Sequence, residues 1–257
     1  MKHMLDNGWE IYPAGGVTGE AFYAFHDNQK LFLKRNSSPF LAVLSAEGIV
    51  PKLVWTKRLE SGDVITAQQW ITGRKLEPND MNGEKVAKLL KKIHQSQPLL
   101  SMLRRLGKTP VHPDMLLIEL ENQMDQALQL NDTIARTIRY LNKLLPTVQR
   151  NTLTVCHGDV NHNNWMLTDE GQLYLIDWEG AIIGDPAIDI APLLYWYIPE
   201  DEWEGWLHNY GITLNDQLQT RLKWYVLYQT LCSIQLYNDK GKLEESLFWI
   251  QYLETLL

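Results

Sequence analysis

The sequence predicts an α+β protein with a small antiparallel sheet in front and a mainly helical part behind. Residues 9–34 alternate short aromatic and β-branched runs with turn signals, a pattern typical of antiparallel strands joined by tight turns. From residue 84 onward, apolar residues recur at helical spacing. The change of period near Gly73 predicts two lobes, residues 1–72 and residues 73–257.

The front lobe is predicted to contain one short helix among its strands. Residues 37–48 begin with Ser37 or Ser38 as a candidate N-cap, place Pro39 in the first turn and stop at Gly48. The runs LVWTKRL and DVITAQQWI then predict two strands, separated by a glycine-containing hairpin loop.

The rear lobe is predicted to begin with three helices, over residues 82–96, 114–130 and 134–145. In the first of them, Val86, Leu89, Leu90 and Ile93 share one face. Short strands follow at LTVC, NWML and LYLID, and the chain is predicted to be mostly helical from about Ile188.

The composition is that of an ordinary globular protein. The chain has 257 residues, of which 45% are hydrophobic and 21% charged, with no repeat or low-complexity tract, so disorder is not expected. No run approaches the roughly 18 apolar residues that a membrane span needs, and no signal-peptide pattern is visible. We therefore expect a cytoplasmic protein whose two cysteines are buried thiols rather than a disulfide or a metal site.

The charge is unevenly distributed along the chain. Residues 1–150 contain 20 Lys and Arg against 15 Asp and Glu, whereas residues 151–257 contain 4 against 16. Most of these charges are expected to be solvated surface. The asymmetry nevertheless suggests an anionic ligand in front, and a metal or a cationic substrate behind. A pI near 5.5 without a basic stripe argues against nucleic-acid binding.

One segment concentrates polar side chains among strand-forming residues: Asp159, Asn163, Asn164, Asp177, Glu179, Asp185 and Asp189. Asp159 and Asn164 have the spacing D-x-x-x-x-N in a loop between two predicted strands, and Asp177 ends the next strand. Two oxygen ligands beside a free carboxylate suit Mg²⁺ better than Zn²⁺ or a fully caged Ca²⁺. In kinases such an Asp accepts the proton of the acceptor hydroxyl, while the Asn and the later Asp hold Mg²⁺.

The motifs HGDVNHNN, LIDWE and GDPAID occur in this order, which resembles the signature of the aminoglycoside phosphotransferase and choline kinase superfamily. The resemblance extends from about Tyr12 to Ala191 and is closest to compact bacterial members. It implies a protein-kinase-like bilobal fold that uses ATP and Mg²⁺ to phosphorylate the hydroxyl of a small molecule.

The resemblance also assigns roles to residues of the rear lobe. It implies Asp159 as the catalytic residue, Asn164 and Asp177 as metal ligands, and His157 as a structural residue of the loop. Asp185 and Asp189 match carboxylates that brace this loop, and His94 matches a structural histidine at a helix end. Asn161 and His162 depart from the family pattern, since many members have His-Pro there.

In the front lobe, residues 14–19 form a glycine-rich loop with Ala14 in the first glycine position. Alone this is weak evidence, because glycine-rich hairpins are common. By resemblance, the expected nucleotide-binding residues are Gly15, Gly16, Thr18, Lys34, Gln69, Trp70 and Ile71. Lys34 matches the phosphate-binding lysine. Its usual acidic helix partner is not obvious, so either Glu47 reaches Lys34 or the pair is replaced.

The acceptor is predicted to be bound by the rear lobe. This part is acidic and contains seven of the ten tryptophans: Trp165, Trp178, Trp196, Trp203, Trp206, Trp224 and Trp249. Aromatic faces beside carboxylates attract ammonium groups, which favours choline, ethanolamine, an aminoglycoside or a thiamine-like alcohol, although packing is the commoner role of such rings.

Two other classes of protein are alternatives to a small-molecule kinase. A catalytically silent nucleotide-binding module on the same fold is retained as an alternative, because the sequence does not show whether Glu47 pairs with Lys34. A protein kinase is disfavoured, since D-F-G and A-P-E motifs flanking an activation loop are missing. The choice between ATP and GTP and the oligomeric state have no visible sequence signal.

Overall fold

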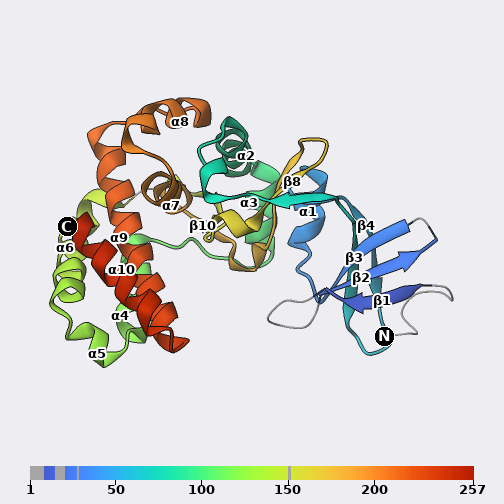
Figure 1. The fold of residues 1–257 in the computed structure, drawn as a ribbon, viewed down its shortest axis with the longest axis horizontal. Helices are drawn as coiled ribbons and strands as arrows, with labels where there is room; N and C mark the ends of the chain where they lie inside the picture. The colour runs from blue at the N-terminus through green and yellow to red at the C-terminus, as the bar shows by residue number, and fades with distance from the viewer. Residues whose placement is uncertain (1–8, 15–20, 28, 150–151) are drawn as a thin grey trace.

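The computed structural model describes residues 9–14, 21–27, 29–149 and 152–257. It has two lobes, with a twisted sheet on one side and a helical body on the other (Figure 1). The chain passes from the first lobe to the second through Trp70–Thr72, directly after the last strand of the sheet.

The sheet of the first lobe is antiparallel, in the order β1-β2-β3-β5-β4. Its strands are β1 Glu10–Pro13, β2 Ala21–His26, β3 Gln29–Arg35, β4 Leu53–Arg58 and β5 Val64–Gln69. One face buries a small core made of Phe22, Ala24, Leu31, Leu33, Ile65 and Ala67. Because side chains alternate along a strand, Lys34 projects from the opposite face, paired in register with Ala21 and Thr66.

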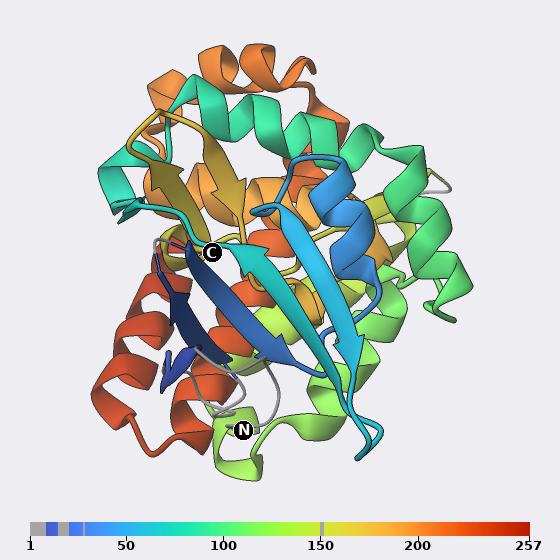
Figure 2. The same cartoon turned by 90° about the vertical axis from the view of Figure 1, so that its right-hand side faces the viewer.

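Helix α1, Phe40–Ala46, joins β3 to β4. The hydroxyl of Ser38 accepts a hydrogen bond from the N–H of Phe40, and Gly48 leaves the helix with φ +66°, a conformation that favours glycine. The helix buries Phe40 and Leu44 in the large core of the second lobe rather than in the sheet core. Figure 2 shows α1 beside β4, against the helices of the second lobe.

The second lobe contains nearly all the helices of the described chain. These are α2 Glu84–Gln95, α3 Gln97–Arg105, α4 Pro113–Gln123, α5 Gln126–Gln129, α6 Asp132–Val148, α7 Ala187–Tyr197, α8 Trp203–Tyr210, α9 Asp216–Asp239 and α10 Leu243–Leu256. Four short 3-10 helices complete them: Pro78–Asp80, His162–Asn164, Trp178–Gly180 and Glu200–Glu202. No helix in the described ranges is long and apolar enough to cross a membrane.

Two small sheets of the second lobe carry the polar segment. Strands β6 Gly73–Lys75, β8 Trp165–Thr168 and β9 Leu173–Leu175 form one antiparallel sheet in the order β6-β8-β9. Strands β7 Thr154–Cys156 and β10 Ile182–Gly184 form the other. The loop with Asp159 lies between β7 and β8, and Asp177 follows β9.

Two sequence-based expectations about helices were wrong. The single helix predicted over residues 114–130 is broken into α4 and α5, because Met124 is extended and the Asp125 carboxylate caps the N–H of Ala127. Helix α3 was not predicted, although Ser96 caps it by accepting from the N–H of Leu99 and Pro98 occupies its first turn.

Candidate functional site

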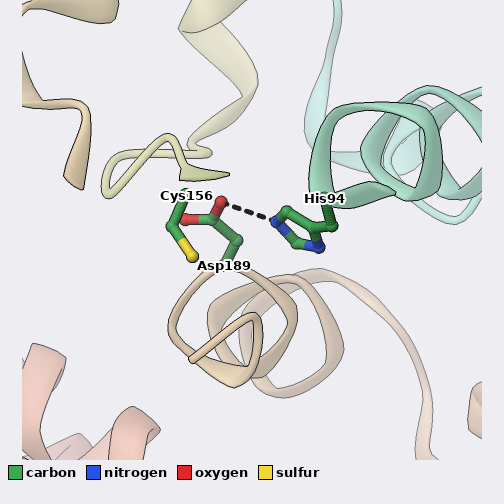
Figure 3. A group of neighbouring side chains, drawn as sticks. All are labelled: His94, Cys156 and Asp189. Carbon is green, nitrogen blue, oxygen red and sulfur yellow. Dashed lines mark hydrogen bonds and ion pairs between the residues drawn. The ribbon is translucent and has the colours of Figure 1, made fainter. Parts of the chain in front are cut away.

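The loop after β7 is fixed by a buried carboxylate. Asp189, in the first turn of α7, is 0% exposed and accepts the N–H of His157 at 2.7 Å and the N–H of Gly158 at 2.8 Å. His94 of α2 adds a contact from Nε2 at 3.0 Å (Figure 3). Burial is the largest single influence and raises the pKa of Asp189, but the hydrogen bonds from His94 and Gly158 and the charge interactions with His94 and His157 together outweigh it, so the pKa lies below its ordinary value.

His157 ties this loop to the segment that precedes Asp177. Its Nδ1 accepts the N–H of Asp159 at 3.2 Å, which leaves the proton on Nε2, and Nε2 donates to the carbonyl of Ile176 at 2.9 Å. The ring also meets Trp178 edge-on, with centroids 4.7 Å apart. Since both ring nitrogens are engaged, His157 holds the loop and has no nitrogen left to act as a base.

Asp159 lies at the exposed tip of the loop with its carboxylate held on both oxygens. The side-chain amide of Asn164 donates to Oδ2 at 3.0 Å and to the Asp159 carbonyl at 2.9 Å. The amide of Asn161 donates to Oδ1 at 2.5 Å. The carboxylate is therefore oriented by two neutral donors and remains open to a molecule from solvent.

The β8–β9 hairpin brings Asn164 close to Asp177. Trp165 lies opposite Leu175, and the N–H of Ile176 donates to the carbonyl of Asn164 at 2.8 Å. Asp177 itself is exposed and has φ +67°, a left-handed conformation that is uncommon outside glycine and clusters at functional sites. With its amide hydrogens on Asp159, Asn164 keeps its oxygen as an acceptor. An amide and a carboxylate oxygen form a hard donor set that fits Mg²⁺.

Lys34 reaches across the two lobes to Glu179. Its Nζ forms an ion pair with the carboxylate of Glu179, which lies in the turn two residues beyond Asp177. Helix α1 contains no acidic residue, and Glu47 follows its end, where the carbonyl of Glu47 accepts from Lys92 of α2. Of the two alternatives left open for Lys34, the structure shows an ion pair with Glu179, and the contact found for Glu47 is made by its backbone carbonyl.

The segment joining the lobes has only part of its backbone engaged. The N–H of Gln69 donates to the backbone carbonyl of Lys52 at 2.8 Å, and the N–H of Trp70 donates to the backbone carbonyl of Lys30 at 3.3 Å. Within the described ranges, no backbone partner is found for the N–H of Ile71. The ring of Trp70 is covered by the ammonium group of Lys30, 3.6 Å from its centroid. Gly15, Gly16 and Thr18 lie outside the described residues.

A buried ion pair that sequence reasoning missed supports the same region. Arg221 of α9 contacts the carboxylate of Asp185 at 3.2 Å, and Asp185 also caps α7 by accepting the N–H of Ala187 at 3.0 Å. In the sequence, the signal for this ion pair was Arg221, a single arginine among the mostly apolar residues that α9 buries.

The buried group of His94, Cys156 and Asp189 combines three metal-ligating residue types, with ligand atoms within 4.8 Å of one another (Figure 3). It is better explained as a structural network. His94 and Asp189 use their polar atoms on each other, on Tyr210 and on the loop backbone. Burial raises the pKa of the Cys156 thiol well above its ordinary value, which disfavours the thiolate that a metal requires. Both cysteines are free.

The chain matches one protein-family model and resembles several solved structures. The model of the phosphotransferase enzyme family matches residues 12–225. Choline kinase LicA from Streptococcus pneumoniae is similar in structure, with a TM-score of 0.68 at 18% identity over 96% of this chain and 93% of that one. The GDP complex of aminoglycoside 2'-phosphotransferase-IIIa has a TM-score of 0.68 at 13% identity over 96% and 92%. Spectinomycin phosphotransferase APH(9)-Ia, in complex with ADP and spectinomycin, has a TM-score of 0.64 at 18% identity over 96% and 88%.

The fold and the polar segment define a two-lobed, kinase-like phosphotransferase, and the similar structures include nucleotide complexes. The chain belongs to the phosphotransferase enzyme family, within the aminoglycoside phosphotransferase and choline kinase superfamily that the motifs had indicated.

Proposed function

We propose that this protein transfers the γ-phosphate of ATP to a hydroxyl group of a small, cationic molecule. The observation that carries the proposal is the exposed carboxylate of Asp159, held by Asn164 within the hairpin that also presents Asp177. These are the side chains that a phosphoryl transfer needs for proton acceptance and for metal binding.

Each lobe supplies one part of the proposed reaction. Residues 1–72 hold the nucleotide, with Lys34, Gly15, Gly16 and Thr18 as the proposed phosphate-binding residues and the base against Gln69, Trp70 and Ile71. Residues 73–257 hold the acceptor. Asn164 and Asp177 are the proposed Mg²⁺ ligands, and the ion, when bound, offsets negative charge on the phosphates.

Asp159 is the proposed catalytic residue. It accepts a hydrogen bond from the acceptor hydroxyl, orients its oxygen toward the γ-phosphorus and takes its proton late in the transfer. Asn161 and Asn164 hold the two carboxylate oxygens without adding charge, so the carboxylate keeps a fixed orientation.

The preference for a cationic acceptor is supported by charge and by partly exposed rings. Trp165, Trp203, Trp206 and Trp224 are buried in the core, so packing explains these four. Trp196 and Trp249 are only partly buried, and their ring centroids lie 5.1 Å apart. Trp196 adjoins Tyr197, whose hydroxyl contacts the catalytic loop at His162. Such rings in an acidic lobe favour a choline-, ethanolamine-, thiamine- or aminoglycoside-like alcohol.

A calorimetric titration with ATP, in the presence and absence of Mg²⁺, tests the nucleotide half of the proposal. Binding is expected to require Mg²⁺ and to weaken in Asp177→Ala, while the matched surface variant Asp169→Ala binds as the wild type does. Metal-independent binding, or none, would contradict the proposal.

Release of ADP then tests the acceptor half, with choline, ethanolamine, thiamine, methylthioribose and several aminoglycosides as acceptors. Turnover with one compound would name the class of acceptor. Tight Mg²⁺-dependent binding without turnover on any compound would favour a second candidate function, that of a catalytically silent nucleotide-binding module. This candidate is retained because Lys34 pairs with Glu179 and not with an acidic residue of helix α1.

A further inference from the structure

Helix α7 contacts the catalytic loop at both of its ends. In its first turn, Asp189 accepts the N–H groups of His157 and Gly158. Its last residue, Tyr197, contacts His162 on the other side of Asp159. The two anchors are eight residues apart on one helix, a separation of about 12 Å at 1.5 Å per residue.

The contact at Tyr197 is chemically specific. The phenol oxygen lies 3.4 Å from the backbone nitrogen of His162 and 3.1 Å from its Nδ1, and the two rings meet edge-on at 5.8 Å. Burial raises the pKa of Tyr197, so the hydroxyl keeps its proton. The backbone N–H donates to the phenol oxygen, and the hydroxyl can donate in turn to Nδ1 when the ring carries its proton on Nε2.

We propose that Tyr197 is a positioning residue for Asp159, and that Asp189 and Tyr197 together make α7 a two-point clamp on the catalytic loop. The proposed clamp rests on the proposed function only because it treats Asp159 as the catalytic residue. The contacts of Asp189 and Tyr197 do not depend on the proposed function.

The clamp lies on either side of the exposed part of the loop. Gly158 and Asp159 are exposed and Gly158 has φ +83°, whereas Val160 is buried and its carbonyl accepts from the indole of Trp165. His162 begins the 3-10 turn that carries Asn164, whose amide donates to Asp159. A hydroxyl that holds His162 therefore sets the spacing between the proposed catalytic residue and its metal-binding neighbour.

His162 also explains why an anchor is needed here. A proline at this position would fix φ and have no N–H to satisfy. Histidine leaves φ free and adds a backbone donor, and the hydroxyl of Tyr197 meets that donor while restraining the ring.

The test compares Tyr197→Phe with Tyr195→Phe on the same helix. The first variant removes one oxygen and keeps the ring that packs on His162, whereas no hydrogen bond from the Tyr195 hydroxyl is found in the described part of the chain. Amide hydrogen exchange, resolved to single residues, is expected to become about three- to tenfold faster around His162 in Tyr197→Phe. The amides of His157 and Gly158 should stay protected by Asp189.

A histidine side-chain ¹⁵N spectrum gives a second reading that needs no activity. In the wild type, neutral His162 should be in the Nε2–H form alone, and Tyr197→Phe should shift it to a mixture of tautomers. If Tyr197→Phe and Tyr195→Phe give the same exchange rates and the same His162 signal, the clamp is overturned, whatever the protein phosphorylates.

Kinetics with the acceptor identified by ADP release measure the consequence for catalysis. We expect kcat to fall about three- to tenfold in Tyr197→Phe, with a smaller rise in KM for Mg·ATP, because His162 also begins the turn that carries Asn164. His162→Ala should add little to Tyr197→Phe, since the pair acts as a unit. A change confined to KM for Mg·ATP, or fully additive effects, would contradict the positioning role.

Discussion

Two carboxylates, one in each lobe, are held in opposite ways. In the second lobe, Asp189 is 0% exposed and binds His94 and two backbone N–H groups. In the first lobe, Asp63 lies at a strand turn, where it accepts from Arg35 at 2.5 Å and from Asn36 at 3.0 Å. Both carboxylates have lowered pKa values, yet only one of them is enclosed by protein.

The difference indicates which contacts keep a fixed geometry and which can exchange with water. A buried carboxylate cannot lose a partner without leaving unsatisfied groups in the core, so it fixes a geometry. An exposed ion pair is screened by water and contributes little, so it can open and re-form. The buried contacts of Asp189 therefore hold the loop before Asp159 in one arrangement, whereas the contacts of Asp63 can exchange with water.

The largest expected effect is on turnover, in Asp159→Asn. The variant keeps the shape of the side chain but loses the proton acceptor, so kcat should fall by about three orders of magnitude. Calorimetry should show Mg·ATP binding within about twofold of the wild type, because Asn164 and Asp177 are unchanged. Asp169→Asn, a surface control in the β8–β9 turn, should have normal activity. An Asp159→Asn enzyme with undiminished turnover would show that the assignment is wrong.

The next largest effect is on stability, in Asp189→Ala. Removing this buried acceptor leaves His94 Nε2 and the two loop N–H groups without a partner, so the free energy of unfolding should fall by about 3–5 kcal/mol. Chemical denaturation followed by circular dichroism measures the loss. A fall no larger than that of a surface substitution would mean that the loop is anchored elsewhere.

Acid should weaken the wild type partly through the same residue. The folded pKa of Asp189 is lowered, so its contribution is present above the unfolded carboxyl value of about 4 and is lost as pH falls through the lower folded value. Melting temperatures recorded from pH 6 down to pH 3 should therefore fall more steeply in the wild type than in Asp189→Ala. Parallel curves would contradict this linkage.

A smaller effect is expected on nucleotide affinity, in Glu179→Gln. The variant removes the charge that holds Lys34 across the lobes, but the Glu179 side chain is 67% exposed, so the Kd for Mg·ATP should rise only about two- to fivefold. The matched control Glu47→Gln should leave the Kd unchanged. If Glu47→Gln has the larger effect, Glu47 rather than Glu179 is the working partner of Lys34.

The smallest effect is expected in Asp63→Ala, the counterpart of Asp189→Ala in the first lobe. Hydrogen bonding from Arg35, Asn36 and Ser61 lowers the pKa of Asp63 to about 2, but water can replace these contacts when the carboxylate is removed. Its melting temperature should lie much closer to the wild type than that of Asp189→Ala. Equal losses in the two variants would remove the contrast between the lobes.

The sequence by itself determined the order of the lobes and the local geometry of the polar segment. Hydrophobic period distinguishes strands from helices, and the loop and hairpin that bring Asp159, Asn164 and Asp177 together span fewer than twenty residues. The broken helix at Met124 shows the limit of this reasoning, since an apolar pattern can continue across a turn that a single cap creates.

Only the tertiary structure decided which residues support that segment. Glu179 meets Lys34 across 145 positions of the chain, Arg221 meets Asp185 across 36, and Tyr197 meets His162 across 35. These partners come from separate elements, and neither period nor motif spacing states how such elements pack. Burial then decides what each contact is worth, because a pair enclosed by the second lobe must be satisfied by protein while a pair at the edge of the sheet can be satisfied by water.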